Sequence, residues 1–184
     1  KKQNTINGIV NIGYTNIETT LHIIQLTMNV VLYMDSFNND FINFLETKEN
    51  IVTHGVFTKI MYSNTLFTMN GLYFFFPIQI QEINCNSFNK LFVKFDPNTN
   101  LNNTIIQHLS NIERSLLQLY SPTKKKNLIF QKQLNSGYIK IHTNRIVRKH
   151  SQFVVKISGI WEDNDDNIGI TYKIIQISNN VINL

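Results

Sequence analysis

Two long β-prone runs near the end of the chain constrain its fold more than any other feature. Phe153–Trp161 and Ile168–Ile177 are dense in β-branched and aromatic residues, which favour strands. The six residues between them, Glu162–Asn167, are all Glu, Asp or Asn, a composition typical of turns. The pattern predicts a hairpin with a charged tip, and the other elements have to be arranged around this two-stranded ribbon.

A second strong pattern predicts one long helix. Apolar residues between Thr104 and Tyr120 recur at spacings of three and four, which places them on one helical face. Asn102 or Asn103 is the expected N-cap of this helix. An earlier, shorter helix is expected from the helical spacing of Phe37, Phe41, Phe44 and Leu45.

Shorter β-prone runs fill most of the remaining chain. We expect strands at Val52–Tyr62, Phe67–Ile83, Lys90–Phe95, Leu128–Leu134 and Tyr138–His142. Within the second of these, Asn70-Gly71 is a strong hairpin signal. Many strands with one long helix inserted between two of them, and one short helix, favour a mainly β fold, an OB-fold-like antiparallel β-barrel. A β-sandwich is the rival, and no break in composition divides residues 1–184 into two domains.

Composition narrows the class of protein. Hydrophobic residues make up 42% of the chain, which is typical of a globular protein. Cys85 is the only cysteine, which excludes an internal disulfide. No apolar run of 18 residues and no secretory leader pattern occur. We therefore expect an intracellular protein without a membrane segment.

Signatures of catalysis are missing. The chain has no Gly-rich phosphate loop, no His-Glu-x-x-His and no Gly-x-Ser-x-Gly. Its five histidines are scattered. Asp163-x-Asp165-x-Asn167 resembles the start of a calcium loop but lacks the later Gly and Glu of such loops. We expect a non-enzymatic protein that needs no cofactor or metal.

Charge is distributed unevenly along the chain. The net charge is +5. The 48 positions between Glu113 and Glu162 hold ten basic residues and no acidic one, and four acids then follow between Glu162 and Asp166. Such segregation creates a field of one sign over part of a surface, which suits a polyanionic partner. Solvated loops on an ordinary basic protein are the alternative explanation.

Aromatic residues are interleaved with these cations. Proteins that bind single strands combine cations that follow phosphates with rings that stack on unpaired bases, although each ring taken singly also fits a place in the core. The candidate nucleic-acid-binding residues are Tyr73, Phe75, Lys124, Lys125, Lys126, Tyr138, Lys140, Arg145, Arg148, Lys149, Lys156 and Trp161.

The last 85 or so residues resemble a known family. Lys156-Ile-Ser-Gly-Ile-Trp161, a polar turn and Ile168-Gly-Ile-Thr-Tyr-Lys173 resemble the terminal hairpin of OB-fold single-stranded DNA-binding proteins of large DNA viruses and short-tailed phages. The resemblance implies a role in DNA replication, recombination or repair, contacts with replication proteins, and a location in the host nucleus or at a viral replication site. The acidic C-terminal tail of the phage proteins has no counterpart in Asn179–Leu184.

A second hypothesis is a structural or assembly subunit, a β-barrel or sandwich in a viral, replication or telomere-type complex. In that case exposed Phe residues at positions 74 to 76 would contact a protein partner. The choice between DNA and RNA stays open, because no residue pattern reports on the 2′-hydroxyl. The sequence also leaves the site size open, and whether the protein forms a homo-oligomer.

Overall fold

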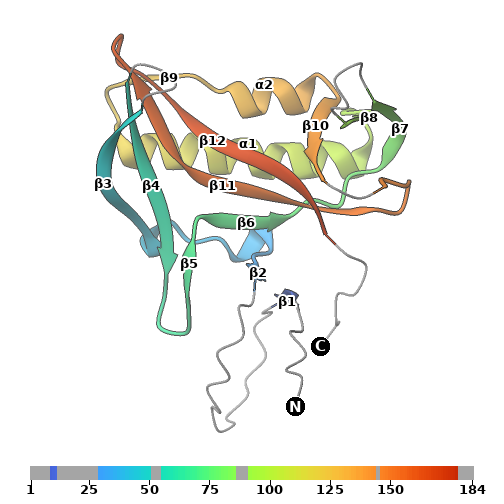
Figure 1. The fold of residues 1–184 in the computed structure, drawn as a ribbon, viewed down its shortest axis with the longest axis horizontal. Coiled ribbons are helices and arrows are strands. Elements are labelled where there is room, and N and C mark those ends of the chain that lie inside the picture. Colours follow the sequence, from blue (N-terminus) through green and yellow to red (C-terminus); the bar gives the residue numbers. More distant parts are fainter. Residues whose placement is uncertain (1–8, 12–28, 51–54, 86–90, 144–145, 178–184) are drawn as a thin grey trace, which may run out of the picture.

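The chain folds into a mainly β structure with two α-helices in its described part (Figure 1). The computed structural model describes residues 9–11, 29–50, 55–85, 91–143 and 146–177. The helices are α1 (Asn100–Tyr120) and α2 (Ile129–Asn135), with two 3₁₀ turns, η1 (Met34–Ser36) and η2 (Asn39–Phe41). The strands are β1 (Ile9–Asn11), β2 (Asn29–Val31), β3 (Ile42–Asn50), β4 (Gly55–Ser63), β5 (Thr68–Asn70), β6 (Leu72–Phe75), β7 (Ile80–Cys85), β8 (Leu91–Phe95), β9 (Lys125–Lys126), β10 (Tyr138–His142), β11 (Gln152–Asp163) and β12 (Asn167–Ile177).

The β11–β12 hairpin lies at the centre of the sheet, which confirms the predicted two-stranded ribbon and its turn. The two strands pair antiparallel from Gln152↔Ile177 to Glu162↔Ile168, with one irregularity at Ser158. Asp163 holds the tip, because its carboxylate accepts the N–H groups of Asp165 and Asn167, both at 2.9 Å. The acidic and amide residues of the tip therefore serve as turn formers.

Other strands extend the sheet on both sides of this hairpin. β4 pairs with the tip half of β11 and β6 with its other half, and β12 is flanked in the same way by β9 and β10. The main path runs β3-β4-β11-β12-β10-β8-β7. β3 and β7 end this path and no described strand joins them, so the structure shows an open, mixed sheet, and the expected OB-fold-like antiparallel barrel is not confirmed. The mainly β class is confirmed.

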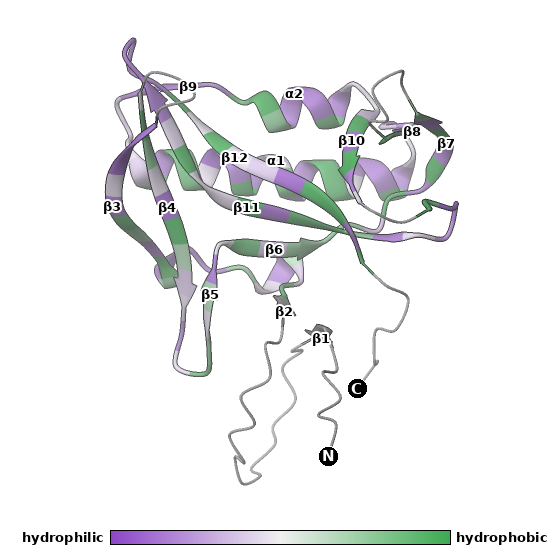
Figure 2. Ribbon diagram, viewed as in Figure 1, coloured by the Kyte–Doolittle hydropathy of each residue, from purple (hydrophilic) through white to green (hydrophobic). Residues whose placement is uncertain are grey.

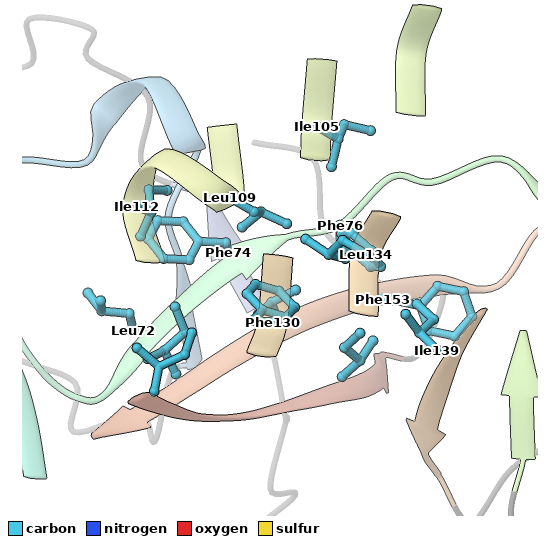
Figure 3. Packing of buried hydrophobic residues seen from close by; sticks show 14 of the residues in the cluster. Leu72, Phe74, Phe76, Ile105, Leu109, Ile112, Phe130, Leu134, Ile139 and Phe153 are labelled. Carbon is cyan, nitrogen blue, oxygen red and sulfur yellow. The ribbon is translucent and has the colours of Figure 1, made fainter. Parts of the chain in front are cut away.

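The hydrophobic core lies between one face of this sheet and the two helices. The α1 helix starts after Thr99, whose hydroxyl accepts the N–H of Asn102, so the predicted helix is confirmed but its predicted cap residue is wrong. Hydrophobic and hydrophilic residues alternate along α1 (Figure 2). Its apolar side meets α2 and the inward side chains of the strands (Figure 3). Fully buried members from different elements include Phe74, Phe76, Leu109, Leu116, Phe130, Leu134, Ile139 and Val155.

Two predicted elements have the wrong secondary structure. The run Leu128–Leu134 is not a strand but contains helix α2. In its first turn, the N–H groups of Phe130 and Gln131 donate to the buried carboxylate of Glu113. Phe37–Leu45 is not a helix. It contains η2 and the start of β3. Phe37 and Phe41 both pack on Tyr62 and Phe44 packs on Tyr120, so these rings reach the core without a helix.

The predicted hairpin at Asn70-Gly71 is also wrong. The hairpin is formed by the preceding pair of strands, β4 and β5. At Gly71 the chain leaves its pairing with β4 and continues as β6, which pairs with β11. Gly71 has φ +91°, and a Cβ there would lie 2.7 Å from the carbonyl oxygen of Ile157. The glycine is needed for a change of partner strand rather than for a tight turn.

Candidate functional site

The two faces of the β11–β12 hairpin differ in chemistry. Phe153, Val155 and Ile157 of β11 are buried on the face that α1 and α2 cover. Lys156 and Trp161 point to the opposite face, since side chains alternate along a strand and the irregularity at Ser158 shifts the register. We call this opposite side of the sheet, which no described helix covers, the open face.

Three lysines from three adjacent strands stand in one line on the open face. Lys156 of β11 is paired directly with Lys173 of β12. Ile141 of β10 is paired with Ile174 of β12 in a parallel ladder, so Lys140 lies beside Lys173. We call Lys140, Lys173 and Lys156 the lysine row.

Aromatic rings stand at both ends of the lysine row. Lys156 is paired with Tyr73 of β6, and its Nζ lies 5.0 Å from the centroid of the Tyr73 ring. At the other end Lys140 is paired with Phe92 of β8. The Phe92 ring is stacked on Tyr138, with centroids 4.9 Å apart and planes 7° apart. The row thus extends across five strands, from β6 to β8.

The lysine row is unfavourable for the folded protein by itself. Like charges placed directly opposite each other on neighbouring strands destabilise a sheet. None of the three lysines makes an ion pair with any residue that the structure describes; the ion pairs of this part of the chain join Lys124 to Glu162 and Asp166, and His108 to Asp35. The row therefore has no structural explanation in charge pairing within the described chain.

His142 responds to the same cations. It follows Lys140 by two positions on β10 and so shares its face. Burial lowers the pKa of His142, and the positive charges of Lys140 and Lys173 lower it further. The open face is thus positive enough to disfavour a further cation.

Trp161 lies flat on the open face because its cross-strand partner is a glycine. It is paired with Gly169, where a Cβ would lie only 2.5 Å from Cζ2 of the indole. The neighbouring ring of Phe57 covers Gly159 in the same way, 2.5 Å from where its Cβ would be. Both rings are half-buried. Two glycines of the hairpin thus make room for two rings on its surface.

A pocket of about 350 Å³ lies beside this indole. Its lining includes Trp161 and Thr171 together with Lys140, His142 and Lys173. The pocket therefore joins the rings of the open face to the centre of the lysine row. Within the described residues no group of three or more His, Cys, Asp and Glu side chains could hold a metal ion.

The basic loop proposed from the sequence lies against the acidic tip. Lys124 pairs with the carboxylates of Glu162 and Asp166, the latter at 3.3 Å. The charge of Lys125 contributes to a lowered pKa of Asp163, after that residue's hydrogen bonds with Asn167. Lys124 is thus paired with acids of the tip. Lys126 donates to the carbonyl of Pro122 at 3.1 Å.

The remaining candidates are divided between two regions. Tyr73, Phe75, Tyr138, Lys140, Lys156 and Trp161 all project from strands onto the open face. Arg148 and Lys149 are exposed on the turn before β11, where the Arg148 N–H donates to Ser151 Oγ at 2.9 Å. Arg145 lies outside the described residues. The structure thus brings together about half of the candidates and leaves the two basic turns apart from them.

Several open-face residues were missed at the sequence level, namely Phe57, Phe92, His142 and Lys173. A signal existed for Lys173. In the predicted hairpin, Lys156 and Lys173 are equally far from the centre of the tip, so they are expected to lie opposite each other on the two strands. His142 also had a signal, since it follows the candidate Lys140 by two positions on a predicted strand. For Phe57 and Phe92 the neighbours on the open face come from distant parts of the chain. Phe74 and Phe76 are fully buried, so the expectation of an exposed Phe run at 74 to 76 is wrong for two of its three residues.

The chain matches no protein-family model, no curated protein and no solved structure. No helix in the described ranges has the length and apolar character that a membrane crossing requires. The geometry of the open face is therefore the feature of the molecule that bears on its function.

Proposed function

We propose that this protein binds single-stranded nucleic acid, DNA in the first place, across the open face of its sheet. The observation that supports this most is the lysine row with Tyr73 and Phe92 at its ends. A polyanion removes the like-charge repulsion that the row creates, and flanking rings offer faces to bases.

The dimensions of the row suit one strand of nucleic acid. Lys156 and Lys173 are cross-strand partners on strands about 4.8 Å apart, and Lys140 lines the same pocket as Lys173. Their long flexible side chains can reach successive phosphates of a strand that crosses the sheet. The rings of Trp161 and Phe57 lie on the same face beside this path, where bases would be placed.

Single strands fit this face better than duplexes. Stacking on a ring needs an unpaired base and is worth about 1–3 kcal/mol per base. Proteins that read duplexes usually insert a helix in a groove, whereas α1 uses its apolar side in the core. The rings that lie flat on the hairpin therefore favour an unpaired ligand.

The biological setting in this proposal comes from the family resemblance of the terminal hairpin. The proposed role is in replication, recombination or repair. The long helix between β8 and β10 is the feature that this chain would share with an OB-fold. The rival hypothesis of an assembly subunit required an exposed Phe run, and burial of Phe74 and Phe76 weakens it.

A titration of the complete chain tests the proposal. Labelled oligo-dT and a duplex of equal length are titrated with protein at several salt concentrations, and binding is followed by anisotropy. We expect preference for the single strand, and a logarithmic salt slope of about −2 if three phosphates are contacted. Equal affinity for both ligands contradicts the stacking part of the proposal, and no binding at low salt contradicts it entirely.

A further inference from the structure

One stretch of the β12 edge has no strand partner in the described chain. β9 pairs with Asn167 and Ile168, and β10 pairs with Ile174 and Ile175. The residues between these ladders, 169–173, face a gap in the sheet on that side. The pocket of about 350 Å³ lies at this gap, since residues 170–174 of β12 and the β10 residues Lys140 and His142 line it.

Main-chain polar groups point into the gap. The carbonyl of Ile168 accepts the N–H of Asn127 at 2.7 Å, so the main chain of Ile168 points toward β9. Because main-chain groups alternate in direction along a strand, those of Ile170 and Tyr172 point the same way. Donors and acceptors without a strand partner therefore line one wall of the pocket.

The side chains of the pocket combine charge with a ring. Lys140 and Lys173 supply two cations, Trp161 supplies an indole, and Gln133 of α2 supplies an amide. The volume is near the lower end of the roughly 300–1,000 Å³ that is usual for small-molecule sites. One nucleotide fits such a space, whereas a run of stacked bases does not.

We propose that this pocket binds a single nucleotide of the bound strand, with the base against Trp161 and the free β12 edge and the phosphate on Lys140 and Lys173. This inference rests on the proposed function and adds a base-binding subsite to it. Base edges carry adjacent donors and acceptors, which the main-chain groups of β12 that point into the gap can match. A flat platform without such an edge would stack a base but would not read it.

Tryptophan fluorescence can test the subsite, because Trp161 is the only tryptophan. The complete chain is titrated separately with deoxynucleoside 5′-monophosphates, the corresponding nucleosides and inorganic phosphate. We expect a saturable change of emission with the monophosphates, a weaker one with the nucleosides, and none with phosphate alone. The inference is overturned if inorganic phosphate competes with a bound monophosphate as effectively as another monophosphate does. The pocket would then be a simple anion site.

Filling the pocket separates this inference from the proposed function. Thr171→Phe places a ring in the pocket without removing a cation, and Thr123→Phe adds an equal ring on the exposed turn before β9 as a matched control. We expect Thr171→Phe to abolish the mononucleotide signal and to weaken oligo-dT binding about tenfold, the value of one stacked base. The control should change neither.

The outcomes are distinct. Circular dichroism checks that each variant folds. If Thr171→Phe does not fold, Thr171→Ile replaces it, because its β-branched side chain also narrows the pocket. Oligo-dT binding by the wild type without any mononucleotide signal overturns the subsite and leaves the proposed function standing. Absence of both signals overturns both.

Discussion

Lys173 occupies the centre of the lysine row, with Lys140 on one side and Lys156 on the other. Its position is the least favourable of the three for an isolated folded chain, because it has a like charge on both sides. The same position is the most favourable for contact with a phosphate, since three positive potentials add there. A residue that opposes folding slightly and attracts a polyanion is best explained by binding.

A matched pair of charge removals tests this explanation. Lys173→Gln and Arg114→Gln each remove one positive charge, but Arg114 is exposed on α1, the helix that packs on the sheet face opposite the row. We expect Lys173→Gln to weaken oligo-dT binding and to reduce the salt slope by about 0.7, with no loss of stability on chemical denaturation. Similar weakening by Arg114→Gln would show that binding depends on net charge rather than on the row.

At the scale of elements, α2 shows how a buried carboxylate positions one wall of the pocket. Glu113 is fully buried on α1 and accepts the N–H groups of Phe130 and Gln131 at the start of α2, at 3.1 and 2.8 Å. Desolvation raises the pKa of Glu113, although these two hydrogen bonds oppose the shift. One ring of α2, Phe130, then packs on Tyr172 of β12. The carboxylate therefore links the long helix to the edge of the hairpin.

Glu113→Gln tests this link through the pH dependence of stability. A carboxyl group whose pKa is raised in the folded state stabilises it most below its unfolded pKa, about 4.5, and this contribution is lost as pH rises through the folded pKa. We expect the free energy of unfolding of the wild type to fall over that range, and Glu113→Gln to lack this dependence. Gln leaves one buried N–H without an acceptor, which should cost about 1–3 kcal/mol. Denaturant titrations at several pH values measure both effects, and equal pH profiles for the two proteins would contradict this role.

At the scale of the whole molecule, the open face combines charges from strands that are far apart in sequence. The pKa of His142 is lowered by burial first and by Lys140 and Lys173 second. Phosphates bound on the row would offset those cations and raise the pKa of His142 again. Binding of a polyanion is therefore expected to be linked to proton uptake by this histidine.

The pH dependence of affinity tests this linkage. We expect oligo-dT affinity to increase as pH falls below about 6.5, the ordinary His value, and His142→Gln to remove most of that increase. The stability of the free protein depends on pH with the opposite sign. Because the pKa of His142 is lowered in the folded state, the free energy of unfolding decreases as pH falls through the same range. Affinity measured at constant ionic strength checks the first expectation, and an unchanged pH profile in His142→Gln would contradict it.

The sequence by itself determined the hairpin β11–β12, helix α1 and the mainly β class. Each of these depends on periodicity and turn residues within one stretch of the chain, and local physics is enough to specify them. Tertiary structure overrode the local pattern elsewhere. The apolar residues of the run that forms α2 fit a strand and a helix equally well. The helix is favoured by Glu113 of α1, whose carboxylate accepts the N–H groups of Phe130 and Gln131 in the first turn.

Only the tertiary structure decided which side chains share the open face. Lys140, Lys156 and Lys173 are separated in the chain, and their alignment follows from the pairing of β10, β12 and β11 and from one irregularity at Ser158. The same pairing left the sheet open and part of the β12 edge without a strand partner in the described chain. Register between strands is set by long-range packing, and a shift of one residue would send every side chain to the other face.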